Sequence, residues 1–203
     1  AWPGAEEQLA GGLDFLLAHC RDPQHDGYYW IVDQQGAPLD DSKVVYGHAY
    51  VIYALAELAL LTGDPRPAAE ARRVFDLLQA RCRDAEHGGY LEHFHRDWRV
   101  KRARNDQPMH KSLDVHMHLM EAFTTLYELT GEAQHRQALL EVADDLQHSG
   151  RIHDPAIHEG VLVPQARIVL PEEEVPHDVR AKFLSKRVHA SFLDRRRPSE
   201  ESG

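Results

Sequence analysis

Apolar residues recur along most of the chain with the spacing of α-helices. Residues 6–19, 67–82 and 132–147 carry apolar side chains at intervals of three and four positions, which predicts three amphipathic helices. Residues 42–64 and 111–131 are apolar nearly all round, so we expect two helices that are buried on both sides. Turn residues and alternating aromatic residues fill the segments between helices, which predicts short β-hairpins in the connecting loops.

The chain also repeats itself. CRDPQHDGYYW begins at Cys20 and CRDAEHGGYLE begins at Cys82, and each block is followed by a lysine and a long apolar helix. In those helices His48 corresponds to His116, at an offset of 68 residues. Similarity at a fixed period marks a repeat architecture. Buried helices that alternate with amphipathic ones predict two concentric layers, which is an all-α toroid of helical hairpins; an open solenoid of hairpins is the alternative.

Composition narrows the range of partners. The 203 residues carry a formal net charge of −10, which argues against nucleic acid and against an anionic membrane surface. We identify no apolar run long enough to span a bilayer and no secretory leader. The two cysteines are interpreted as free, reduced thiols, so we expect a cytoplasmic protein.

Histidine is frequent, with 15 in the chain, so metal binding has to be weighed against acid–base chemistry. His116 and His118 are two positions apart, and on a helix such residues point about 200° apart, so they do not share one ion. His93 and His95 share a face if EHFH is a strand, but a solvated loop is the favoured interpretation. We therefore expect no metal and no cofactor.

His118 and Glu121 are three positions apart, which places both on one helix face. A carboxylate beside an imidazole orients the ring, so the ring can act in turn as base and acid. His48 lies in the first turn of the preceding buried helix, where inner helices of a toroid converge. The alternative for these histidines is a set of partnered residues in the core or at its rim.

Aromatic residues gather in the connecting segments. Such rings can stack on the apolar faces of sugars, and they can equally cap a core. The residues concerned are Tyr28, Tyr29, Trp30, Tyr90, Phe94 and Trp98.

Three segments carry a resemblance to a known family: KVVYGHAYVIYALAE, DAEHGGYLEHFHRDW and KSLDVHMHLMEAFTTLYELTG. In that order and spacing they resemble the N-acylglucosamine 2-epimerase family over roughly residues 10–150, and most of all its cellobiose (mannobiose) 2-epimerase branch. The resemblance implies an all-α, partial (α/α)6 toroid or barrel. It also implies a sugar isomerase or epimerase that inverts C2 of the reducing-end sugar by histidine-mediated proton transfer through a cis-enediolate. The implied partner is a small carbohydrate, without a cofactor, and a homodimer is expected.

The resemblance also implies roles for individual residues. His118 resembles the acid/base histidine of the family, Glu121 its orienting carboxylate, and His48 the histidine that contacts the sugar and assists ring opening. Three further residues are implied in substrate binding: Tyr46, Trp98 and Asp114. Asp114 departs from the family motif, which has asparagine at this position.

Beyond residue 150 the helical periodicity and the resemblance fade. We expect residues 1–150 to be a fragment of the barrel and residues 151–203 to be a divergent C-terminal segment, either frameshifted or poorly ordered. Two other functions stay open, an α/α-barrel glycoside hydrolase or lyase and a non-catalytic helical-repeat binding module. Asp26, Glu92 and Asp97 are the candidate hydrolase carboxylates, and the fragment on its own could be inactive.

Overall fold

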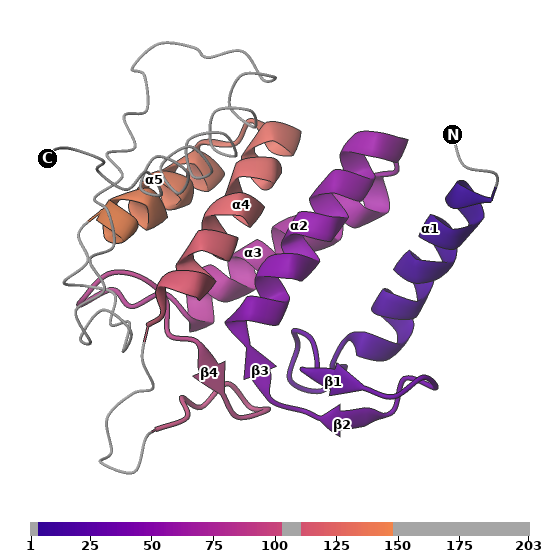
Figure 1. Ribbon diagram of the computed structural model, residues 1–203, viewed down its shortest axis with the longest axis horizontal. Coiled ribbons are helices and arrows are strands. Elements are labelled where there is room, and N and C mark those ends of the chain that lie inside the picture. Colours follow the sequence, from indigo (N-terminus) through magenta and orange to yellow (C-terminus); the bar gives the residue numbers. More distant parts are fainter. Residues whose placement is uncertain (1–3, 103–110, 148–203) are drawn as a thin grey trace, which may run out of the picture. The chain divides into compact units, whose positions relative to one another are not determined.

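The computed structural model describes residues 4–102 and 111–147, which form a layered helical body (Figure 1). A π-helical turn, η1, extends the first helix. The helices are α1 (Ala5–Phe15), η1 (Leu16–Cys20), α2 (Val45–Thr62), α3 (Pro65–Arg81), α4 (Leu113–Thr130) and α5 (Ala133–Gln147). All five helices expected from the apolar spacing are confirmed.

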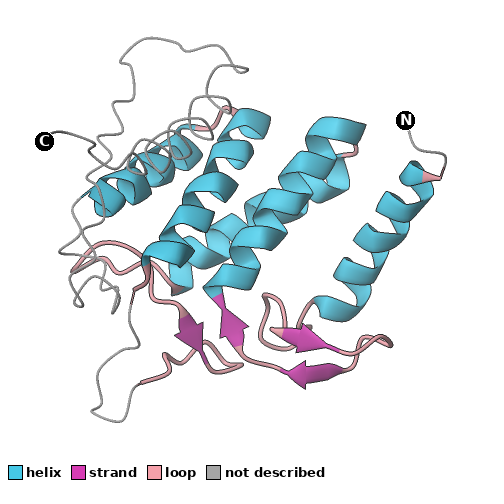
Figure 2. Ribbon diagram, in the orientation of Figure 1, coloured by secondary structure: helices cyan, strands magenta, loops and turns pink. Residues whose placement is uncertain are grey.

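Short strands occupy the connecting loops, as predicted. β1 (Ile31–Val32) and β2 (Pro38–Asp40) form an antiparallel hairpin between α1 and α2. β3 (Lys43–Val44) pairs antiparallel with β4 (His93–Phe94), which comes from the next connecting loop. Figure 2 shows both pairs at the same end of the helices. The strands therefore tie successive loops together where the long apolar helices begin.

Local sequence explains where the helices begin and end. α2 and α4 stop at Gly63 and Gly131, whose φ angles of 71° and 65° lie in the left-handed region that glycine adopts without steric cost. The side chains of Asp64 and Ser112 accept backbone N–H groups from the first turns of α3 and α4. These four residues mark the ends of α2 and α4 and the starts of α3 and α4 through local interactions.

The helices form two layers. α2 packs against α4 and α3, and α4 packs against α5, while Figure 1 shows α2 and α4 side by side with α3 behind. The space between the layers is filled by buried apolar side chains, among them Ile52, Leu55, Val74, Phe75, Leu119 and Phe123. This arrangement confirms the predicted alternation of inner and outer helices.

The expectation that both long helices are buried on both sides is wrong. α2 is apolar all round, yet Tyr50, Tyr53, Leu60 and Leu61 are exposed among the described residues, so only one face is buried. Met117 of α4 is exposed in the same way. By length and composition α2 is also apolar enough to cross a membrane, which corrects the expectation that no segment reaches that length. Core helices of soluble proteins meet the same criterion, and the other face of α2 packs against α3 and α4.

Cys20 and Cys82 hold free thiols, as expected, and Cys82 is fully buried. The C-terminal segment 151–203 lies outside the described residues. The boundary at residue 150 therefore stays a prediction.

Candidate active site

The first half of α4 gathers an imidazole and two carboxylates. Nδ1 of His118 lies 3.0 Å from Oε2 of Glu121, and Nε2 of His118 lies 3.5 Å from Oδ1 of Asp114. These pairs arise from the helix itself, because residues three and four positions apart share a face. The His118 side chain is 19% exposed, so the imidazole is held by neighbours and still reaches the surface. With Nδ1–H donating to Glu121, Nε2 is the nitrogen that can take a proton.

Two tyrosines of α2 enclose the His118 ring. The ring centroids of Tyr46 and Tyr50 each lie 4.9 Å from that of His118, with Tyr46 edge-on. A side-chain hydrogen bond with Tyr46 raises the pKa of Tyr50 to about 12, so the Tyr50 phenol stays protonated near neutral pH. Tyr46 and Tyr50 precede Asp114 and His118 by the 68 residues of the helix repeat. The same face of each inner helix therefore points at the other.

Glu92 joins the starts of these two helices. Its backbone carbonyl accepts the N–H of Val45 at 3.0 Å, at the first residue of α2. Its carboxylate accepts the N–H of Ser112 and the hydroxyl of Ser112, the latter at 3.1 Å, at the N-cap of α4. Glu92 is buried, and burial raises the pKa of this carboxyl. Sequence reasoning treated Glu92 only as a hydrolase candidate, and the tertiary structure gives it a positioning role.

His48 is not placed as expected. It is only 2% exposed; its Nε2 accepts the N–H of Tyr28 at 3.0 Å, and its Nδ1–H donates to the carbonyl of Val44 at 2.8 Å. Burial lowers the pKa of this imidazole to about 4. Both nitrogens are therefore occupied inside the protein, and the expected contact of His48 with a sugar is corrected to a structural role.

The repeat partner of His48 makes the same contacts. Nε2 of His116 accepts the N–H of Tyr90 at 3.0 Å, and its Nδ1–H donates to the carbonyl of Ser112 at 2.8 Å. A glycine precedes each tyrosine because a Cβ there would collide with the imidazole, at 2.7 Å from His116 Nε2 in the case of Gly89. The repeat was the signal that could have placed His48 correctly, since His116 and His118 point in different directions on one helix.

Trp98 also lies apart from the His118 cluster. Its indole N–H donates to the carbonyl of His25 at 2.8 Å, and its ring contacts those of His48 and Phe94. Together with loop residues 21–26 it lines a cavity of about 680 Å³ whose lining does not include His118. The structure thus brings Tyr46 and Asp114 to His118 and Glu121, and it leaves Trp98 with His48.

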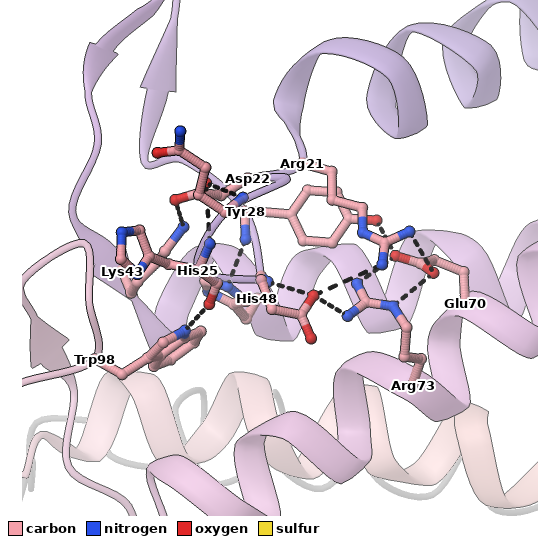
Figure 3. Close-up of polar contacts among 12 residues, drawn as sticks. Arg21, Asp22, His25, Tyr28, Lys43, His48, Glu70, Arg73 and Trp98 are labelled. Carbon is pink, nitrogen blue, oxygen red and sulfur yellow. Dashed lines mark hydrogen bonds and ion pairs between the residues drawn. The ribbon is translucent and has the colours of Figure 1, made fainter.

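A buried charge network holds the first loop in place (Figure 3). Lys43 Nζ lies 2.9 Å from Asp22 Oδ2, with both side chains fully buried, and Arg96 donates to both oxygens of the same carboxylate. Burial opposes ionisation of Asp22, but the hydrogen bonds from Arg96 and Lys43 prevail and hold the pKa of that carboxyl below its ordinary value. Lys111 and Asp84 repeat the ion pair at 2.6 Å in the second loop.

Metal ligands are not clustered in the part of the chain that the structure describes. Residues 4–102 and 111–147 contain no group of three or more His, Cys, Asp or Glu side chains placed to hold an ion. His93 lies in β4 and is partly buried, whereas His95 is exposed beyond the strand.

Comparison with known proteins identifies the family. The N-acylglucosamine 2-epimerase family model matches residues 1–157. Cellobiose 2-epimerase of Bacteroides fragilis is 31% identical over 59% of this chain and 32% of its own length. D-mannose isomerase of Thermobifida fusca is 31% identical over 72% of this chain and 34% of its own length. The chain thus spans about a third of the length of the curated relatives it matches.

A solved structure agrees with this assignment. Cellobiose 2-epimerase of Spirochaeta thermophila has a TM-score of 0.66 and 34% identity, over 71% of this chain and 37% of the other. The described helices are accordingly part of an (α/α)6 barrel, as expected from the repeat and the resemblance. With the family match over residues 1–157 and the shared fold, the chain belongs to the N-acylglucosamine 2-epimerase family.

Proposed function

We propose that this chain carries the proton-transfer part of a sugar 2-epimerase or aldose–ketose isomerase site, with His118 as the acid/base. The supporting observation is the 3.0 Å contact between His118 Nδ1 and Glu121, which leaves Nε2 of a partly exposed ring for a substrate proton. The names of the relatives, cellobiose 2-epimerase and D-mannose isomerase, point to the same chemistry. The substrate is accordingly a small carbohydrate.

The proposed reaction acts on the open-chain sugar. Nε2 of His118 takes the proton from C2, the C2–H electrons form the C1–C2 double bond, and the carbonyl electrons move onto O1 to give a cis-enediolate. Delivery of a proton to the opposite face of C2, by a second donor on that face, gives the epimer. Protonation of C1, with transfer of the O2 hydroxyl proton to O1, gives the ketose. Glu121 holds Nδ1–H and stabilises the imidazolium that forms, and Asp114 adds a second negative charge beside Nε2.

Within this class we propose a disaccharide of the cellobiose or mannobiose type whose reducing-end sugar reacts at C2. The Asp114 carboxylate in place of asparagine keeps an oxygen acceptor at the same position and adds charge. The two tyrosines beside His118 offer ring edges and hydroxyls to the polar and apolar faces of a pyranose.

The contacts that the three candidate carboxylates already make disfavour the hydrolase alternative. Hydrolysis needs a pair that faces the scissile bond across a cleft. Asp26 pairs with Arg73, Asp97 pairs with Arg99, and Glu92 is buried against Ser112. A non-catalytic binding module is the remaining alternative, and it predicts binding without exchange of the C2 proton.

Proton NMR of the full chain with cellobiose in deuterium oxide tests the proposal. Loss of the C2 proton signal and appearance of the epimer are expected, and His118→Gln should abolish both. His87→Gln is the matched control, because His87 is exposed and pairs with the acidic neighbours Asp84 and Glu86 in the second loop. Exchange that persists in His118→Gln would assign the proton transfer to another group, and binding without exchange would favour the binding module.

Two further proposals concern the protein as a whole. Free thiols persist in a reducing compartment, and Cys20 and Cys82 are both free, so we propose a cytoplasmic location. The expected homodimer stays a prediction, and sedimentation of the full chain measures it.

A further inference from the structure

Trp30 is a large apolar side chain that stays 40% exposed beside the candidate site. Its indole meets the ring of Tyr46 edge-on at 6.3 Å, and Tyr46 meets His118 at 4.9 Å. Two ring contacts therefore separate Trp30 from the imidazole. A sugar seated on Trp30 would be the neighbour of the sugar at His118 and not the same ring.

The helix beneath Trp30 leaves space for its ring at Gly47. A Cβ at Gly47 would lie 3.2 Å from both Cε3 and Cζ3 of Trp30, so any side chain at position 47 would press on the indole. Glycine is unfavourable within a helix, yet it occupies the first turn of α2. This glycine leaves the space in which the Trp30 ring sits.

The backbone on both sides of Trp30 is also held. The N–H of Tyr28 donates to His48 and that of Tyr29 to the carbonyl of Cys20 at 2.9 Å, and β1 begins directly after Trp30. The Tyr29 ring lies against Lys43 and Arg96, with the cations 4.9 and 5.4 Å from its centroid. Trp30 is thus a rigid, exposed ring that needs little ordering when a ligand stacks on it.

We propose that Trp30 is a stacking platform for a second sugar ring, adjacent to the ring held at His118, so that this site favours a disaccharide over a monosaccharide. This inference rests on the proposed function and deepens it. Pyranose rings present apolar C–H faces, and an indole is the largest aromatic surface that a protein can offer them. The carbohydrate recognised is a chain of at least two hexoses.

Calorimetric titration of the full chain with cellobiose and with glucose tests the platform. Trp30→Ala should weaken cellobiose binding about tenfold, which corresponds to about 1.4 kcal/mol, and leave glucose binding unchanged. Trp30→Phe should lose less, because it keeps an aromatic ring, and Gly47→Ala should weaken cellobiose selectively by displacing the indole. Leu39→Ala is the matched control, since Leu39 is a 70% exposed apolar residue of the same hairpin.

Each other result overturns the platform. If Trp30→Ala weakens the binding of cellobiose and glucose equally, or weakens neither, Trp30 does not bind a second sugar ring. A change of oligomeric state in Trp30→Ala without selective loss of cellobiose means that the surface contacts protein. Chain that does not bind cellobiose at all also rejects the platform. Proton exchange at C2 is measured separately. If Trp30→Ala weakens cellobiose binding selectively but the chain exchanges no C2 proton, the platform is supported and the proposed function is rejected. If the chain exchanges the C2 proton but Trp30→Ala leaves cellobiose binding unchanged, the proposed function is supported and the platform is rejected.

Discussion

Acid should weaken this fold through the buried imidazole of His48. Protonation would place a second donor at Nε2, where the N–H of Tyr28 already donates, so the folded protein binds the proton poorly. Burial lowers the pKa of His48 from 6.5 to about 4 and outweighs the hydrogen bond to the Val44 carbonyl, which favours the charged ring. Lys43 and Arg73 oppose the charge further, and Asp26 favours it. The folded state therefore prefers the neutral ring more strongly than the unfolded chain does.

The sign and size of the effect follow from proton linkage. Between pH 6.5 and about 4 the unfolded chain binds a proton that the folded chain does not, so the free energy of unfolding falls as the pH falls. A tenfold difference in proton affinity is worth about 1.4 kcal/mol, so the contribution of His48 is about 3 kcal/mol. It is fully present above pH 6.5, and about 2 kcal/mol of it is lost by about pH 5.

Urea unfolding of the full chain at several pH values between about 4 and 7 measures this effect. His48→Gln should be less stable near pH 7, and its stability should fall with acid by about 3 kcal/mol less than that of the unaltered chain. His87→Gln, which alters an exposed imidazole, should follow the unaltered chain in parallel. Equal slopes for His48→Gln and the unaltered chain would refute the reasoning, because carboxylates such as Asp22 would then account for the acid sensitivity.

Two further predictions concern the residues that position the loops and the inner helices. Gly89→Ala should destabilise the chain by about 2 kcal/mol, because the φ of Gly89 is +68° and the new Cβ would meet His116 Nε2 at 2.7 Å. Gly11→Ala is the control: this helical position has open space around it, so the change should be neutral or slightly stabilising. Equal thermal stability of the two variants would contradict the proposed collision. Glu92→Gln should cost about 1–3 kcal/mol in urea unfolding and slow C2 proton exchange, because an amide has only one acceptor oxygen for the N–H and the hydroxyl of Ser112, which loosens the start of α4. Glu86→Gln, at an exposed carboxylate, is the control, and full exchange activity in a folded Glu92→Gln chain would speak against the positioning role.

The sequence by itself determined the features that depend on near neighbours along the chain. Gly63 and Gly131 end α2 and α4 because glycine adopts the left-handed conformation, and this preference is local. The contact between His118 and Glu121 follows from helical spacing alone, so it could be predicted before any fold was known. The repeat and the three motif segments identified the family for the same reason, since they are read directly along the chain.

Only the tertiary structure decided which side chains of different elements meet. The Tyr46 ring reaches His118 because α2 and α4 lie side by side, and Glu92 joins the starts of both helices across 20 residues of chain to Ser112. Helical spacing gives the angle of a side chain around its own axis, but not which neighbour that face meets. For this reason His48 was expected at the sugar and lies in the core, where the N–H of Tyr28 and the carbonyl of Val44 occupy both of its nitrogens.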